Sequence, residues 1–371
     1  MSGDLKYWLV DYIRTQGPLS IAQFMAFALH HPDGGYYTSR ARLGRSGDFL
    51  TAPLASPMFG ELIGLWCVQT WADMGAPNPV RLIELGPGTG VMMADMLRAA
   101  RVCPDFLDAV RVSLVETSPG LAERQKRSLA RAPAPPDWTT RLDAVADDAP
   151  TLIVANEFLD CLPIRQFVRV EGAWRERRVG VNPDVPERLA FIANPASIGP
   201  ADLAILPQAW RGAAPAGALI EARPGVEPLL ADIKHRFAQC PGRALFIDYG
   251  PAESELGDTL QAIAGHRKVD PLEAPGAADL TARVDFADLA DQAKRLGLRV
   301  DGPLEQGVWL NALGLGVRAE ALATAQPDQR ASLRTQTARL AHSDQMGKLF
   351  KSVVLSSFDL PIAAGFAPIT V

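Results

Sequence analysis

The feature that most constrains the fold of this chain is an apolar run that ends in a glycine turn. Residues 80–85 read Val-Arg-Leu-Ile-Glu-Leu, and Gly86, Gly88 and Gly90 follow before a helical pattern over 91–101. Glycine allows a sharp bend and the close approach of a ligand, because it has no Cβ. The N-terminus of the next helix offers unpaired N–H groups. A strand–turn–helix unit of this kind predicts a doubly wound α/β fold with a nucleotide-like ligand at the turn.

Two classes of cofactor use this geometry, and the sequence favours one of them. A dinucleotide site has a third glycine at the last position of G-x-G-x-x-G, where this chain has Val91. The chain matches instead the E-x-G-x-G-x-G pattern of S-adenosylmethionine enzymes. That cofactor carries a cationic amino group and a cationic sulfonium, so an acid at the strand end suits it. We therefore expect Glu84, Gly86, Gly88 and Gly90 to bind S-adenosylmethionine; a tight turn without a ligand is the alternative.

Three more acids are candidates for the same cofactor. Glu116 ends the next predicted strand, 110–115, where a carboxylate in doubly wound folds binds ribose hydroxyls; a helix-capping glutamate is the alternative. Asp143 is a candidate to face the adenine from the third strand. Asp48 lies in an irregular segment, 31–57, that we expect to fold over the cofactor as a lid.

A second polar group follows the buried strand 152–155 and is the candidate acceptor side. It contains Asn156, Glu157 and Asp160. Two carboxylates and an amide at a sheet edge are unfavourable unless they pair with a ligand or with each other. A guanidinium pairs well with two carboxylates, which would orient it for methyl transfer. The alternative interpretation is a helix N-cap network around Asn156.

The rest of the chain indicates how these segments are organised. Apolar strands alternating with helices predict a parallel sheet covered on both faces, and Asp248 and Tyr249 follow one more such strand, 244–247, on the acceptor side. We expect two late strands, at 308–313 and 352–356, to form an antiparallel pair that completes a seven-stranded sheet. The predicted helices cover 5–30 with a break at Gly17-Pro18, 58–73 and 317–345, and the predicted hairpin lies within 167–182. We divide the chain into N-terminal helices and lid, 1–78, and a catalytic domain, 79–371, with an insertion at about 165–240.

Composition excludes several classes of protein. The 371 residues carry a net charge of −5 with no block of Lys or Arg, so we expect no nucleic-acid partner. Four widely spaced cysteines and five scattered histidines predict no metal site. No apolar run is long enough to span a membrane, and the N-terminus lacks the pattern of a targeting signal, so we expect a cytoplasmic location. Trp8 and Tyr12 of the first helix fit either a homodimer interface or packing on the sheet.

Several segments together resemble the MidA-like family, which comprises the mitochondrial complex I assembly methyltransferases and their bacterial relatives. The similarity runs in order along nearly the whole chain. The matching segments are HP…GYY (31–37), GDFLTAP (47–53), FGE (59–61), the glycine motif (84–90), NEFLD-x-LP (156–163), DYG (248–250), GDTL (257–260), DP…PG…DLTA (270–282), VDF (284–286) and MG…FK (346–351).

The resemblance implies a class I, Rossmann-like methyltransferase fold and, in the mitochondrial members, dimethylation of an arginine on a quinone-module subunit of complex I. The expected function is therefore protein arginine N-methylation with S-adenosylmethionine as the cofactor. Two alternatives stay open. One is a methyltransferase of the same fold that acts on a small molecule, and the other is a complex I assembly chaperone that retains the cofactor fold.

Overall fold

A computed structural model describes residues 5–40, 51–212 and 214–367. Its internal contacts divide the chain into two compact units. The sheet unit comprises 50–159, 229–252 and 289–371, and the accessory unit comprises 1–49, 160–228 and 253–288. The division at residues 78 and 79, with an insertion at 165–240, stays a prediction about domains. Asp48, which the sequence predicts to bind the cofactor, lies outside the described residues.

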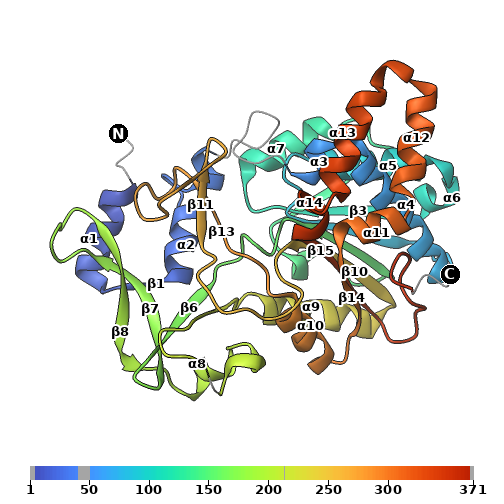
Figure 1. The fold of residues 1–371 in the computed structure, drawn as a ribbon. Coiled ribbons are helices and arrows are strands. Elements are labelled where there is room, and N and C mark those ends of the chain that lie inside the picture. The colour runs from blue at the N-terminus through green and yellow to red at the C-terminus, as the bar shows by residue number, and fades with distance from the viewer. Residues whose placement is uncertain (1–4, 41–50, 213, 368–371) are drawn as a thin grey trace. The chain divides into compact units, whose positions relative to one another are not determined.

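The sheet unit is built on one mixed sheet of seven strands (Figure 1). The strand order is β14-β15-β10-β5-β2-β3-β4. Six strands run in the same direction, whereas β15 pairs antiparallel with both of its neighbours. The strands are β2 (Val80–Leu85), β3 (Val110–Val115), β4 (Asp137–Thr139), β5 (Thr151–Asn156), β10 (Gly242–Tyr249), β14 (Arg299–Glu305) and β15 (Phe350–Ser356). The predicted seven-stranded α/β sheet is confirmed, and the late antiparallel pair in it is β14 with β15.

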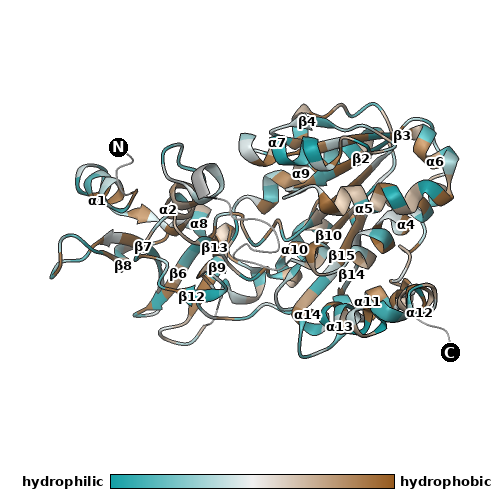
Figure 2. Cartoon of the chain, turned by 90° about the horizontal axis from the view of Figure 1, so that it is seen from above, coloured by the Kyte–Doolittle hydropathy of each residue, from teal (hydrophilic) through white to brown (hydrophobic). Residues whose placement is uncertain are grey.

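Helices cover both faces of this sheet, as the parallel strands require. Figure 1 shows α4 and α5 on one face and α9 and α10 on the other. The strands β5, β10 and β15 are buried along their whole length, and Figure 2 shows hydrophobic residues concentrated on the strands of this sheet. The helices are α3 (Ala52–Ala55), α4 (Pro57–Asp73), α5 (Val91–Ala99), α6 (Pro104–Ala109), α7 (Pro119–Ser128), α9 (Val226–Gln239), α10 (Phe286–Arg295), α11 (Gln306–Ala312), α12 (Leu315–Ala325), α13 (Arg330–Ala341) and α14 (Met346–Leu349).

The topology places a switch point at the centre of the sheet. From β2 the chain adds β3 and β4 on one side, then crosses back to add β5 and β10 on the other. Ligands of open α/β sheets bind beyond the carboxyl ends of the strands at such a point. A ligand site of the sheet unit is therefore expected at the carboxyl ends of β2, β3, β5 and β10.

The accessory unit contains two small sheets and the N-terminal helices. One sheet has the order β1-β7-β6-β9 with β8 paired to β7, and the other has the order β12-β11-β13. The elements are α1 (Leu5–Gln16), β1 (Leu19–Ser20), α2 (Ile21–His30), β6 (Arg165–Val170), β7 (Ala173–Val181), β8 (Leu189–Ser197), α8 (Pro200–Ala204), β9 (Leu219–Ala222), β11 (Gln261–Ala264), β12 (Arg267–Val269) and β13 (Asp279–Thr281). The predicted hairpin within 167–182 is confirmed as β6 and β7.

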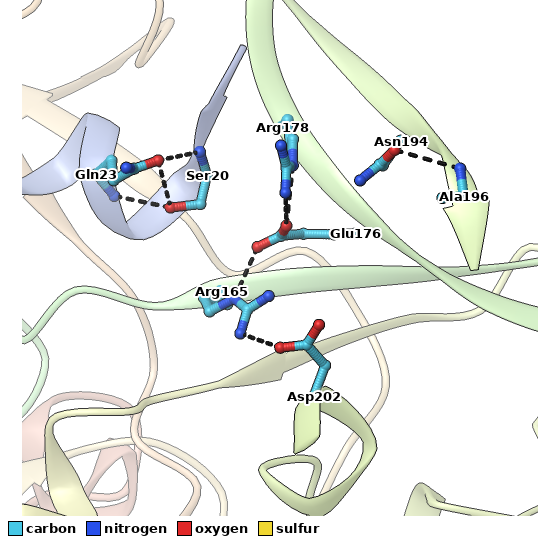
Figure 3. A network of polar contacts seen from close by, with 8 residues as sticks. All are labelled: Ser20, Gln23, Arg165, Glu176, Arg178, Asn194, Ala196 and Asp202. Atoms are coloured by element: carbon cyan, nitrogen blue, oxygen red, sulfur yellow. Dashed lines mark hydrogen bonds and ion pairs between the residues drawn. The ribbon is translucent and has the colours of Figure 1, made fainter. Parts of the chain in front are cut away.

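Local polar contacts stabilise elements of this unit. Ser20 caps α2 through a capping box: its hydroxyl accepts from the Gln23 N–H at 3.1 Å, and the Gln23 side chain accepts from the Ser20 N–H at 2.9 Å. Figure 3 shows Glu176 on β7 between Arg165 and Arg178, with donor–acceptor distances of 2.7 Å to each arginine. The buried carboxylate is thus paired on both sides.

One predicted strand is wrong. Residues 308–313 lie in α11 and the residue that follows it, and the strand that occupies the sheet edge is β14, 299–305. A short apolar run fits a buried helix as well as a strand, because its periodicity does not separate the two.

Within the described residues, no helix has both the length and the apolar character needed to cross a membrane.

Candidate functional site

The glycine turn between β2 and α5 leaves open space above its middle residue. Gly86, Gly88 and Gly90 have φ values of 63°, 53° and 76°, in the left-handed region that favours glycine. A Cβ added to Gly86 would lie 2.9 Å from the Phe158 ring, whereas a Cβ on Gly88 would meet no heavy atom of the described residues within 4 Å. The backbone of this turn can therefore be approached closely at Gly88.

Glu84 is a buried acid at the carboxyl end of β2. Glu84 is 2% exposed, and its Oε2 atom has no hydrogen-bond partner among the described residues. Burial, and next the negative charge of Glu116, raise the pKa of this carboxyl to about 8. A buried carboxylate in this state is unfavourable unless a cation or a donor reaches it.

Glu116 follows β3, and the chain itself holds its carboxylate in place. Oε1 accepts from the Ser118 N–H at 2.7 Å, and Oε2 accepts from the Gln125 side-chain amide at 2.9 Å. Burial raises the pKa of Glu116 as well. The same Gln125 amide donates to the Gly88 carbonyl at 2.9 Å, so one side chain of α7 connects the glycine turn with Glu116. Sequence reasoning misses Gln125, since its only local signal is a polar residue at a buried helix position.

The end of β5 presents a second buried acceptor. Asn156 is 8% exposed, and its Nδ2 donates to Glu157 Oε1 at 3.0 Å. The Asn156 Oδ1 atom is buried and has no hydrogen-bond partner in the part of the chain that the structure describes. Glu157 Oε1 also accepts from the Ala52 N–H at 3.1 Å, and the Glu157 backbone has a φ of 51°. Such a conformation in a non-glycine residue is strained and is found most often at functional sites.

Asp248, at the end of β10, accepts from the backbone that follows β5. Its Oδ2 atom accepts from the Phe158 and Leu159 N–H groups at 3.1 and 2.9 Å, and its Oδ1 accepts from the Tyr249 N–H at 2.8 Å. The Tyr249 ring lies 5.8 Å from the Phe350 ring, centroid to centroid. Asp248 therefore shapes the turn that carries Glu157.

The two remaining predicted site residues, Asp143 and Asp160, follow β4 and β5 in the chain. Asp143 lies in a 3₁₀ turn after β4, where its half-exposed carboxylate accepts from the Arg141 Nε at 2.9 Å. Asp160 is 5% exposed and belongs to the accessory unit, where its carbonyl accepts from the Ala282 N–H at 3.0 Å. Among the described residues, no three His, Cys, Asp or Glu side chains form a group that could hold a metal ion.

These features fit S-adenosylmethionine better than a nucleotide phosphate. The Glu84 carboxylate suits the cationic amino group or sulfonium and would repel a pyrophosphate. Glu116 offers acceptors of the kind that bind ribose hydroxyls. The open space at Gly88 gives a ligand access to the backbone, and the absence of a Cβ there is what permits it.

Comparisons with known proteins agree with this assignment. Residues 62–304 match a family described as "Putative S-adenosyl-L-methionine-dependent methyltransferase". The mouse "Protein arginine methyltransferase NDUFAF7, mitochondrial" is 33% identical over 92% of this chain and 82% of its own length, and a Drosophila melanogaster homologue is 32% identical over 95% and 85%. A crystal structure from Burkholderia thailandensis, bound to S-adenosyl-homocysteine, superposes with a TM-score of 0.84 and 25% identity over 98% of this chain and 94% of that one.

The comparisons also correct one expectation. The curated relatives are mitochondrial by name, in the mouse and in human alike. They point to the mitochondrion, and the expected cytoplasmic location is therefore wrong.

The fold, the cofactor and the enzyme class follow from these matches together with the site. S-adenosylmethionine is the cofactor of this enzyme, and its seven-stranded sheet is the class I methyltransferase fold. The chain belongs to the family of S-adenosylmethionine-dependent methyltransferases that includes the protein arginine methyltransferases NDUFAF7.

Proposed function

We propose that this enzyme N-methylates an arginine of a protein, and that its substrate is a quinone-module subunit of respiratory complex I. The names of the curated relatives support arginine as the acceptor, at 33% identity over most of both chains. The resemblance to the MidA-like family supports the choice of subunit.

A homodimer is a further proposal. Trp8 is 37% exposed and stacks on Tyr12, with 5.1 Å between the ring centroids. The surface around these two rings is the one we would test first.

The observation that carries the proposal is the polar end of β5. A guanidinium group has several N–H donors and no acceptor. Asn156 Oδ1 is a buried acceptor, and the neighbouring Glu157 carboxylate is oriented by the Asn156 amide and the Ala52 N–H. An acceptor oxygen beside an oriented carboxylate matches the donor pattern and the charge of an arginine.

In this proposal the chain's own residues position the acceptor and receive a proton. When bound, the cofactor supplies the methyl group from its sulfonium. Transfer to a guanidinium nitrogen forms a C–N bond, breaks the S–C bond and releases one proton from that nitrogen. We assign orientation of the nitrogen to Asn156, and charge pairing and proton acceptance to Glu157 and Asp160. Asp248 and Tyr249 hold the turn between these two acids.

On the cofactor side we assign each strand end a part of the ligand. Glu84 would pair with a cationic group of the cofactor, and Glu116 would accept from the ribose hydroxyls. Gly86, Gly88 and Gly90 would allow the backbone to approach the cofactor. Asp48, as part of the lid, and Asp143, toward the adenine, complete the proposed set.

The test is methyl transfer to a purified quinone-module subunit with labelled S-adenosylmethionine, followed by peptide mass spectrometry. We expect methylarginine with the wild-type chain and none with Glu84→Ala. The matched control is Glu123→Gln, which changes an exposed acid of α7 paired with Lys126 and should keep full activity. Transfer to the subunit on another residue type would contradict the proposed acceptor.

The two alternatives predict other outcomes. If the chain binds the cofactor and methylates no protein but does methylate small molecules of a metabolite extract, the protein substrate is wrong. If a chain carrying Asn156→Ala and Glu157→Gln transfers no methyl group yet still restores complex I assembly in cells that lack the enzyme, the chaperone function is the correct one.

A further inference from the structure

We infer that Gln125 is a positioning residue for the cofactor: it holds the Glu116 carboxylate and the Gly88 carbonyl in the one arrangement that the cofactor site requires. The inference rests on the proposed role of Glu116 in binding the cofactor. It does not depend on which substrate accepts the methyl group.

The side chain of Gln125 has every polar atom engaged. It is 0% exposed, and its Nε2 donates to the Gly88 carbonyl and to Glu116 Oε2, each at 2.9 Å. Its Oε1 accepts from the Trp138 indole N–H at 3.0 Å. The partners decide which way the amide points, because two acceptors on one side and one donor on the other admit only this orientation.

The three partners of Gln125 come from three different strands or the turns that follow them. Gly88 belongs to the turn after β2, Glu116 follows β3, and Trp138 lies on β4. The helix α7 also approaches the turn closely: a Cβ on Gly90 would lie 3.3 Å from the Gln125 Cα, and the Ser128 hydroxyl donates to the Thr89 carbonyl at 2.9 Å. Among the described residues of α7, Gln125 is the one whose side chain donates both to the glycine turn and to Glu116.

The chemistry requires an amide at this position. Without the Nε2 donors, the Gly88 carbonyl and Glu116 Oε2 would both lose a buried partner, and such groups are unfavourable when unsatisfied. Glu116 could then rotate away from the orientation in which it accepts from the ribose. An ionised carboxylate at position 125 would repel Glu116 directly. A methionine has a similar shape and would remove every hydrogen bond without adding charge.

The test compares Gln125→Met and Gln125→Glu by calorimetric titration with S-adenosylhomocysteine, which needs no substrate. We expect Gln125→Met to weaken binding roughly 10- to 50-fold at every pH. Gln125→Glu should bind weakly at pH 8 and, relative to the wild type at the same pH, recover several-fold at pH 5.5, because a protonated carboxyl can again donate one hydrogen bond and no longer repels Glu116. Glu84, whose pKa the charge of Glu116 helps to raise, titrates in both proteins, so the comparison with the wild type removes its contribution. If Gln125→Glu weakened binding equally at pH 8 and pH 5.5, the inference would be overturned.

A double-variant cycle separates positioning from simple structural support. If Gln125 acts through Glu116, Gln125→Met should cost much less binding in a Glu116→Ala background than in the wild type. The same loss in both backgrounds would overturn the inference. Thermal unfolding without ligand reports whether each variant folds, and Glu123→Gln on the same helix is the control expected to bind like the wild type. Failure of arginine methylation with intact S-adenosylhomocysteine binding would concern the proposed function and leave this inference standing.

Discussion

The acids at the ends of β2 and β3 and the acid at the end of β10 lie at the same edge of one sheet, yet they differ in what satisfies them. Glu84 keeps a buried oxygen without a hydrogen-bond partner among the described residues, and burial raises the pKa of both Glu84 and Glu116. Asp248 instead accepts from three backbone N–H groups of the chain. Glu84 therefore keeps an acceptor oxygen that a ligand can use, whereas the oxygens of Asp248 already accept from the chain.

This difference assigns the two regions different tasks. A carboxylate that lacks a partner in the folded chain can use its full interaction energy on a cationic ligand. A carboxylate that already holds three N–H groups cannot bind a ligand strongly without releasing them, so it orients its neighbours instead. Removing Glu84 should therefore affect binding and pH dependence, and removing Asp248 should affect stability.

The largest expected effect concerns Glu84 and pH. Its pKa is raised from 4.5 to about 8, so between these pH values the folded chain without cofactor binds more protons than the unfolded chain. The free energy of unfolding should therefore fall as the pH rises from about 4.5 to about 8, by on the order of 4 kcal/mol. Glu84→Gln should remove most of this slope, measured by urea unfolding at a series of pH values.

Two comparisons sharpen that measurement. Glu116, whose pKa is raised as well, should leave a smaller slope of the same sign in the Glu84→Gln variant. Glu123→Gln, an exposed change, should keep the wild-type slope. Identical slopes in Glu84→Gln and wild type would show that Glu84 does not carry a raised pKa and would remove the contrast with Asp248.

The next effect concerns Asp248. Asp248→Ala leaves the N–H groups of Phe158, Leu159 and Tyr249 without their acceptor, so the free energy of unfolding should fall by on the order of 3 kcal/mol. Asp248→Asn keeps one acceptor oxygen and should lose about half as much. At a temperature where both variants are folded, affinity for S-adenosylhomocysteine should stay within about threefold of wild type. A larger loss of affinity than of stability would reverse the assignment of the two regions.

A smaller effect is expected at Asn156, which belongs to the acceptor side. Asn156→Ala should lower kcat by roughly 10- to 100-fold, because its buried Oδ1 would no longer orient the acceptor nitrogen. Affinity for S-adenosylhomocysteine should stay close to wild type. Asn194→Ala on β8, which removes a side chain that accepts from the Ala196 N–H, is the matched control and should keep kcat (Figure 3). Weaker cofactor binding with unchanged kcat would move Asn156 to the cofactor side.

The smallest effect on stability, with a clear effect on binding, is expected at Gly88. Gly88→Ala places a Cβ in open space at a φ of 53°, so it should lower the free energy of unfolding by only about 1 kcal/mol. The same Cβ would occupy the space that we assign to the cofactor and should weaken binding about tenfold or more. Gly172→Ala in the β6–β7 turn has a φ of 78° and equally open surroundings, and should show the strain without the loss of binding. Equal binding by both variants would show that the space above Gly88 is not used.

Local patterns in the sequence predicted the elements whose cause is local. The strands predicted at 80–85 and 110–115 match β2 and β3. The strand at 308–313 failed because a buried helix and a buried strand share the same short apolar run. The strand at this edge of the sheet is β14. It contains Gly302-Pro303 and a register shift, and both interrupt the alternating pattern by which a strand is recognised in a sequence.

The sequence by itself determined that an acid and three glycines stand at the first turn of a doubly wound sheet, because one strand, one turn and one helix are encoded by a dozen consecutive residues. Only the tertiary structure decided which acids are left for a ligand. Asp248 accepts from two N–H groups about ninety positions earlier in the chain, and Gln125 connects Gly88 with Glu116 and Trp138. Hydrogen-bond partners and desolvation depend on elements that are distant in the chain, so the role of a carboxylate becomes visible only when those elements pack together.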